Sequence, residues 1–181
     1  TPITSNHPLR GGKGGIHEGG VRVPAVVVWP GVTKPGSRNE TRIQAIDLYP
    51  TILHMLGVER PETAVIDGVD FTEALRGAKV ERSPMFTYVP SHGNTPHWLP
   101  PSMSVHVGDW KLIRTFYYGD DNAHKYRLYN LQDDIGESHN LAATHPEKVR
   151  ELDGFIDTYI KEVDVVLPAG YPNCDSVVFH P

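Results

Sequence analysis

A glycine-rich segment near the start of the sequence carries three positive charges within a short stretch. It runs Pro8-Leu-Arg-Gly-Gly-Lys-Gly-Gly-Ile-His-Glu-Gly-Gly-Val-Arg22 and holds Arg10, Lys13 and Arg22. Glycine lets a backbone approach a ligand closely, and a lysine ammonium is a compact charge suited to an anionic oxygen. No Ser or Thr follows Lys13, as a Walker A phosphate loop would require. The segment therefore predicts an anion-binding loop, with a plain flexible turn as the alternative.

A second candidate for ligand binding lies in residues 90–102, a long loop with four prolines. Loops on a rigid scaffold commonly carry binding residues. Histidine together with tryptophan suits a sugar ring, because the indole face packs on C–H groups while imidazole bonds hydroxyls. An ordered surface loop is the alternative, and two histidines on such a loop are weak evidence for zinc, so we assign no metal ligands. The candidate substrate-binding residues here are His92, Asn94, His97 and Trp98.

The elements that position these residues differ between the two halves of the chain. In the first half, the short apolar run 21–29 is typical of a buried strand in a parallel sheet covered on both faces. Asp47 and Gly57 bracket a predicted helix, and a shorter helix over 71–76 ends at Gly77. The polar residues 78–82 follow, and we place the domain boundary there.

The second half predicts strands followed by one helix. Strands are expected over 84–89 and 126–131, and a hairpin over 103–107 and 110–117 turns at Gly108-Asp109. Apolar residues recur at helical spacing over 146–163. We predict a small antiparallel sheet with the helix on one face. The expected domains are therefore residues 1–77 and residues 78–181.

Composition excludes several classes of protein. The chain has 181 residues, of which 39% are hydrophobic and 22% charged. Such a composition should bury a core. The formal net charge is -5 and no long basic run appears, which argues against nucleic acid or an anionic membrane as partner. The longest apolar run is too short to cross a bilayer, and no signal peptide is expected from Thr1 onward.

Five motifs in order give the chain a resemblance to a known family. They resemble the type I, formylglycine-dependent sulfatases, which are arylsulfatase-like members of the alkaline phosphatase superfamily, and the match covers nearly the whole chain. The motifs are Leu9–Gly14 with Glu18–Pro24, Asp47–Thr51, Asp67–Phe71, Gly108–Ile113, and Leu128–Leu131 with Gly136-Glu137 and Asn140-Leu141.

The resemblance implies a fold, a reaction and a role for two residues. The fold would be the end of an alkaline-phosphatase-like α/β domain (residues 1–77) plus a small C-terminal antiparallel sheet with one packed helix (residues 78–181). The reaction would be hydrolysis of a sulfate ester of a carbohydrate or an aryl group. Lys13 would be the catalytic lysine that contacts the sulfate, and His17 would line the same pocket. Such enzymes bind calcium and are secreted or periplasmic.

The family's other catalytic groups are missing from this sequence. No Cys or Ser stands in the Cys/Ser-x-Pro/Ala-x-Arg motif that yields formylglycine; Cys174, for example, precedes Asp-Ser-Val-Val. By resemblance, the last calcium ligands would lie just upstream of Thr1. The chain alone is therefore expected to be inactive and to need the N-terminal part of the same enzyme. Two alternatives remain. The chain could be the C-terminal part of a related phosphodiesterase or phosphonate hydrolase, or it could be a non-catalytic carbohydrate-binding or structural module.

Overall fold

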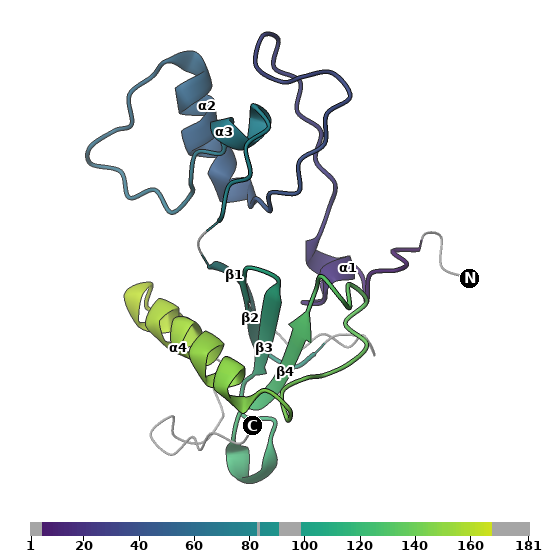
Figure 1. Ribbon diagram of the computed structural model, residues 1–181. Coiled ribbons are helices and arrows are strands. Elements are labelled where there is room, and N and C mark those ends of the chain that lie inside the picture. Colours follow the sequence, from purple (N-terminus) through teal and green to yellow (C-terminus); the bar gives the residue numbers. More distant parts are fainter. Residues whose placement is uncertain (1–4, 83, 91–98, 168–181) are drawn as a thin grey trace. The chain divides into compact units, whose positions relative to one another are not determined.

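The computed structural model describes residues 5–82, 84–90 and 99–167 (Figure 1). The chain forms two compact units. We call Thr1–Val23 with Pro84–Pro181 the sheet unit, and Pro24–Ser83 the helical unit. Within the described ranges, no helix is long and apolar enough to cross a membrane.

The sheet unit is built on four antiparallel strands in the order of the sequence. The turn between β2 and β3 contains Gly108, which has a φ of 56°. Such a positive φ suits a residue without a Cβ. A short 3-10 helix, η2 (Asp120–Asn122), lies between the last two strands. The predicted strands and hairpin are therefore confirmed, with ends shifted by one or two residues. The strands are β1 (Met85–Val89), β2 (Ser102–Val107), β3 (Trp110–Thr115) and β4 (Lys125–Asn130).

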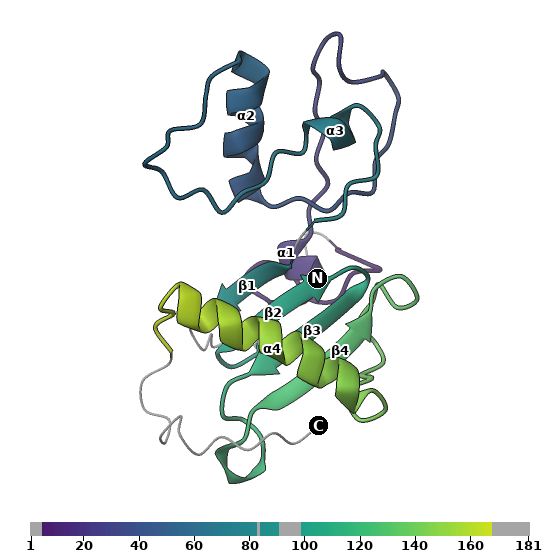
Figure 2. The same ribbon diagram turned by 60° about the vertical axis from the view of Figure 1, so that its left-hand side comes forward.

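The predicted C-terminal helix is α4 (Pro146–Glu162), and it lies along one face of the sheet (Figures 1 and 2). Pro146 occupies the first turn, where its missing N–H costs nothing. Val149, Leu152 and Ile156 of the predicted apolar face are buried, Tyr159 and Ile160 are partly buried, and Val163 follows the helix and is exposed. Arg114 of β3 crosses to the helix and pairs with Asp153 and Asp157. The main core contains Met103, Val105, Leu112 and Leu128 from the strands and Val149, Leu152 and Ile156 from α4.

The opposite face of the sheet is covered by the glycine-rich segment. The side chains of Ile113 and Tyr129 alternate with those facing α4, and they pack on Ile16 in a second, smaller core. The segment ends in one helical turn, α1 (Glu18–Val21). Residues 5–23 therefore contact a sheet that follows them much later in the sequence. The assignment of residues 1–77 to a larger α/β domain stays a prediction.

The helical unit contains η1 (Ala45–Asp47), α2 (Leu48–Leu56) and α3 (Thr72–Leu75). Both helices were predicted, and Gly57 ends α2 in the left-handed conformation. The unit is tied together by the buried carboxylate of Asp47. It accepts hydrogen bonds from the backbone N–H of Gln44 and Val69, and it pairs with Arg82 at 2.8 Å. Polar contacts thus hold much of this unit.

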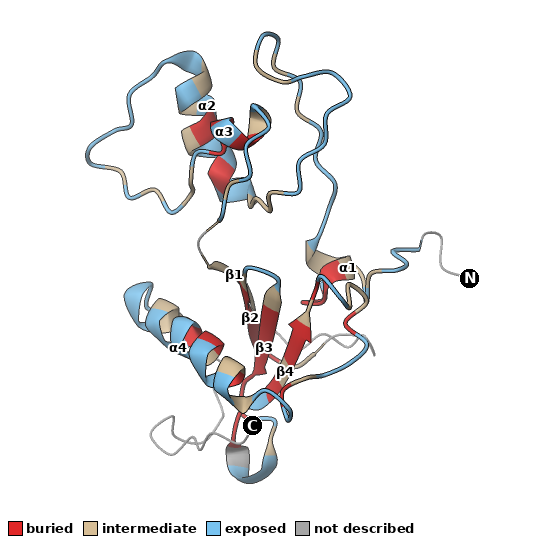
Figure 3. Ribbon diagram, viewed as in Figure 1, coloured by how far each residue is buried: buried red, intermediate tan, exposed pale blue. Residues whose placement is uncertain are grey.

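The strand predicted over residues 21–29 is wrong. Val21 ends α1, and residues 22–29 belong to no helix or strand. Val23, Val26 and Val28 are 80–90% exposed, and Figure 3 colours most of the segment that follows α1 as exposed. An apolar run of this type becomes a strand only between neighbouring strands, because its backbone and both faces need partners. The part of the chain that the structure describes offers none.

Candidate functional site

Lys13 stands at the tip of a tight turn. The N–H of Gly15 donates to the carbonyl of Gly12 at 2.9 Å, which places Lys13 and Gly14 at the two central positions. Gly14 has a φ of 88°. Glycine adopts this conformation without strain. The Lys13 side chain is exposed, and no carboxylate among the described residues pairs with it. The turn therefore presents an unneutralised ammonium to its surroundings.

The segment around this turn is closely packed rather than loose. Gly19 donates to the carbonyl of Arg10 at 2.8 Å, and the Asn6 amide bridges the carbonyls of Gly11 and Gly19. A Cβ placed on Gly20 would lie 2.1 Å from the Gly15 carbonyl oxygen. Only glycine permits this approach. These contacts argue against a flexible turn, while anion binding by Lys13 stays a prediction.

A buried cluster of charges lies under the loop, on the face of the sheet away from α4. The Lys111 ammonium of β3 is fully buried and donates at 2.9 Å both to the Ile16 carbonyl and to Glu18 Oε1. His106 Nε2 of β2 lies 2.9 Å from the same Glu18 oxygen. One carboxylate of the loop is thus held by two side chains of the sheet.

Glu137 completes the cluster from the segment after β4. Its Oε1 lies 2.9 Å from the Lys111 ammonium, and its Oε2 accepts a 2.6 Å hydrogen bond from the Glu18 N–H. His17 Nδ1 lies 3.1 Å from Glu137 Oε1, but the two atoms are poorly aligned, so we treat the contact as electrostatic. The Glu137 carbonyl also accepts from Arg10 at 2.8 Å.

The environment lowers the pKa of both carboxyls in this cluster. Burial by itself raises the pKa of Glu18, but the hydrogen bond with His106 and the charge of Lys111 outweigh it and bring the pKa to about 2. For Glu137, burial likewise raises the pKa, and the contact with His17 and the charge of Lys111 bring it below its ordinary value. Opposite charges and hydrogen bonds favour the charged form of a carboxyl. Both groups are therefore carboxylates at neutral pH.

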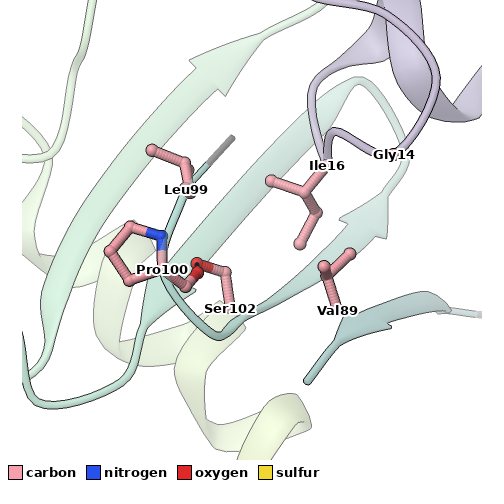
Figure 4. A pocket seen from close by; sticks show the side chains of 6 residues that line it. All are labelled: Gly14, Ile16, Val89, Leu99, Pro100 and Ser102. Carbon is pink, nitrogen blue, oxygen red and sulfur yellow. Dashed lines mark hydrogen bonds between the residues drawn. The ribbon is translucent and has the colours of Figure 1, made fainter. Parts of the chain in front are cut away.

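A small apolar pocket adjoins the Lys13 turn within the sheet unit (Figure 4). The Ser102 hydroxyl is already bonded to the Pro100 carbonyl and the Thr115 hydroxyl, so the pocket offers little to a charged ligand. Its lining consists of Gly14, Ile16, Val89, Leu99, Pro100 and Ser102.

Comparison with known proteins shows the family to which the chain belongs. Residues 12–162 match the family described as N-sulphoglucosamine sulphohydrolase, C-terminal. The chain belongs to the sulfatase family. It corresponds to the C-terminal part of a sulfatase, as its motifs indicated.

Individual relatives agree with this membership. A sulfatase of Formosa agariphila is 33% identical over 151 residues, which is 80% of this chain and 27% of that protein. The steryl-sulfatase of Rattus norvegicus is 37% identical over 116 residues, or 63% of this chain and 19% of that protein. The chain therefore spans less than a third of the length of these relatives.

Solved structures show the same fold. The crystal structure of Ps i-CgsB in complex with k-i-k-neocarrahexaose superposes with a TM-score of 0.74 at 22% identity, covering 94% of this chain and 35% of that one. At this identity the likeness speaks for the fold alone. The sulfatase neighbours have the alkaline-phosphatase-like α/β fold, and the predicted antiparallel sheet with a packed helix is confirmed.

The site residues predicted from the sequence fall into three positions. Lys13 is exposed on the glycine-rich loop, while His17, four residues later, is buried against Glu137 and Tyr129. The substrate contact of His17 stays a prediction. The contacts of its ring in the structure are with Glu137 and Tyr129. The residues named in the proline-rich loop lie outside the described residues. These are His92, Asn94, His97 and Trp98.

The sequence did not predict the buried cluster, although Glu18, Lys111 and Glu137 each stand in one of the five family motifs. Glu18, Lys111 and Glu137 come from three separate motifs, and nothing local joins them. One signal was available. Successive side chains of a strand point to opposite faces of the sheet, so Lys111 must point to the face opposite to Trp110 and Leu112. A charge there predicts an internal partner whenever that side is covered.

The calcium that the family resemblance implies finds no site among these residues. In residues 5–82, 84–90 and 99–167, no three His, Cys, Asp or Glu side chains are arranged to hold a metal ion. The clustered carboxylates of Glu18 and Glu137 are neutralised by Lys111 instead. The described part of the chain therefore does not fit the metal, and we assign it no metal-dependent step.

Proposed function

We propose that the complete protein hydrolyses sulfate esters, and that this chain supplies the lysine that contacts the sulfate. The observation that carries the proposal is Lys13, which is exposed and unpaired among the described residues on a closely packed loop. Membership of the sulfatase family supports it. Because the chain spans under a third of its relatives, the activity belongs to the complete protein.

The chemistry needs a positive charge at this place. When the S–O bond of a sulfate ester breaks, negative charge grows on the sulfate and on the leaving oxygen. An ammonium fixed beside a sulfate oxygen stabilises that charge most in the transition state. If the loop keeps its conformation when substrate binds, little further conformational entropy is lost in placing the lysine. We assign no nucleophile to this chain, because the motif that yields formylglycine is not in its sequence.

The proposed substrate is a sulfated carbohydrate or an aryl sulfate. The matching family is described by a sulfated amino sugar, which favours the carbohydrate. We assign recognition of the leaving group to the loop 90–102, with His92, Asn94, His97 and Trp98 as the sugar-binding side chains and His17 near the sulfate. We propose calcium as the cofactor, held outside this chain, and a secreted or periplasmic location by resemblance to the family.

The helical unit supports a partner within the same polypeptide. Many of its large apolar side chains are exposed, and exposed apolar surface of this extent is typical of an interface. We propose that the N-terminal part of the enzyme covers it, with residues 23–28 adding a strand to the sheet of that part. The exposed residues are Val26, Val28, Ile46, Leu48, Tyr49, Ile52, Leu56, Val58 and Val65.

Turnover of matched substrates by the complete protein tests the reaction class. We expect hydrolysis of p-nitrophenyl sulfate to exceed that of p-nitrophenyl phosphate and bis-p-nitrophenyl phosphate, since the leaving group is the same in all three. The 181-residue chain alone should hydrolyse none of them, even with calcium added. Preference for a phosphate ester would favour the phosphodiesterase alternative. Sugar binding without turnover of any ester would favour the non-catalytic module.

A further inference from the structure

We propose that Lys111 is a positioning residue for Lys13, and that it acts through Glu18 and Glu137. The inference rests on the proposed sulfatase function and adds to it a residue outside the substrate's reach. Lys111 is fully buried and contacts no solvent, so it cannot bind substrate itself. What it does contact is the backbone and the carboxylates that define the course of the Lys13 loop.

The contacts fix the loop on both sides of Lys13. On the C-terminal side, the Lys111 ammonium holds the Ile16 carbonyl, three residues from Lys13, and the Glu18 carboxylate. On the N-terminal side, Arg10 donates to the Glu137 carbonyl at 2.8 Å. Glu137 joins the two sides, because its carboxylate lies 2.9 Å from Lys111 and accepts the Glu18 N–H. The ends of the loop are therefore tied to a single cation in the sheet.

Stability alone is a poor reason for burying these charges. A buried ion pair loses much of its hydration, and apolar side chains of similar volume often serve the fold as well or better. The surroundings of Lys111 would accept such a replacement, because Ile16, Ile113 and Tyr129 already form an apolar core on this face. Hydrogen bonds from one ammonium to a carbonyl and a carboxylate, with an ion pair to a second carboxylate, specify a position, which an apolar contact does not.

Arg114 provides a matched control on the same strand. It is also a buried cation on β3, three residues from Lys111, but it faces α4 and pairs with Asp153 and Asp157. Its removal leaves carboxylates at the sheet without their partner, as removal of Lys111 does. The hydrogen bonds and ion pairs of Arg114 among the described residues go to α4 and not to the Lys13 loop. Asp157 is half exposed and Asp153 keeps a hydrogen bond from Tyr126, whereas Glu18 and Glu137 are buried, so Arg114→Met should cost the fold less than Lys111→Met. The control therefore shows what losing a cation of β3 does to kcat when the loop keeps its contacts.

The test is a double-mutant cycle in the complete protein, with kcat and KM for p-nitrophenyl sulfate as the readout. Lys111→Met should lower kcat by on the order of 10–100-fold with little change in KM, because misplacing a transition-state contact acts on kcat. In a Lys13→Ala background the same substitution should lower kcat less than about 2-fold, because residues that act through one another are not additive. Arg114→Met should leave kcat within about 3-fold of the unmodified protein.

The outcomes separate the inference from the proposed function. If Lys13→Ala lowers kcat and Lys111→Met has no effect, or the same effect in both backgrounds, the positioning role is wrong and the proposed function survives. If Lys13→Ala itself leaves kcat unchanged, the proposed function fails and the inference with it. Should Lys111→Met not fold, Glu137→Gln takes its place in the cycle. It keeps an oxygen for the Glu18 N–H and removes the charge that faces Lys111 and His17, and the same non-additivity is expected.

Discussion

The two units of this chain differ in how many apolar side chains they bury. The sheet unit buries aliphatic side chains on both faces of its sheet, against α4 on one side and the glycine-rich loop on the other. The helical unit buries few apolar residues, chiefly Phe71 and Ala74, and relies on the hydrogen bonds of Asp47. Because many of its large apolar side chains are exposed, we expect this unit to pack against another part of the protein. The sheet unit is the part that holds the glycine-rich loop in place.

The contrast predicts a large difference in local stability within the chain alone. Backbone amides of α2 should exchange with solvent roughly 1,000-fold faster than those of β3, because opening free energies follow the buried apolar contacts of each unit. Hydrogen exchange followed by mass spectrometry measures both in one sample. Residues 10–20 should resemble the sheet unit, since they pack on it. Equal protection of α2 and β3 would break the comparison.

Truncation of one apolar side chain in each unit gives a second contrast. Leu112→Ala should lower the free energy of unfolding of the chain by about 2–5 kcal/mol, the usual cost of a cavity in a closed core. Ile52 lies at a half-exposed position on α2. Ile52→Ala should therefore lower the free energy of unfolding by only about 0.5 kcal/mol, as surface substitutions usually do. Urea denaturation measures both.

The same pair of variants sharpens the proposed partner surface. In the complete protein, the cost of Ile52→Ala should rise toward that of a core position if the N-terminal part covers α2. An Ile52→Ala cost that stays the same in the chain and in the complete protein would mean that this face remains in water.

Acid stability depends on the buried cluster of the sheet unit. The pKa of Glu18 is 4.5 in the unfolded chain and about 2 in the folded one. Because the folded pKa is depressed, the contribution of Glu18 is complete above its unfolded pKa and is lost as the pH falls toward its folded pKa. The shift corresponds to about 3 kcal/mol. Glu18→Gln should lower the free energy of unfolding at neutral pH by this order, and its deficit relative to the unmodified chain should shrink at about pH 3.

An exposed glutamate of the helical unit serves as the control for that titration. Glu73 forms only a surface pair with Arg76. Glu73→Gln should therefore change the free energy of unfolding by about 0.5 kcal/mol at most, at either pH, which is the usual scale for exposed ion pairs. The outcome against the account is a Glu18→Gln variant whose deficit does not change between neutral and acid pH.

The comparison also marks what the sequence could predict. The strands from Met85 onward, the Gly108 turn and the face of α4 were predictable, because period and turn residues encode them locally. The run 21–29 was not, since an apolar run forms a strand only beside partners, and its own residues cannot supply them. Its composition indicates a segment that needs neighbouring strands, and the described residues of this chain do not provide them.

The candidate site divides in the same way. Lys13 could be found because glycines and a lysine are adjacent in the sequence and carry a family motif. The cluster beneath it could not, because Lys111 meets Glu18 across 93 residues and Arg10 meets Glu137 across 127. Such contacts depend on the register of β2, β3 and the loop, which no local pattern specifies.

The most direct test of the account is the kcat of Lys13→Ala in the complete protein. If the exposed ammonium stabilises charge that grows on the sulfate, kcat for p-nitrophenyl sulfate should fall by on the order of 10²–10³-fold, with a much smaller rise in KM. Lys13→Arg should restore activity only in part, because a planar guanidinium directs its donors differently. A kcat unchanged by Lys13→Ala on sulfated carbohydrate and aryl sulfate alike would contradict the account and leave the glycine-rich loop as a structural turn.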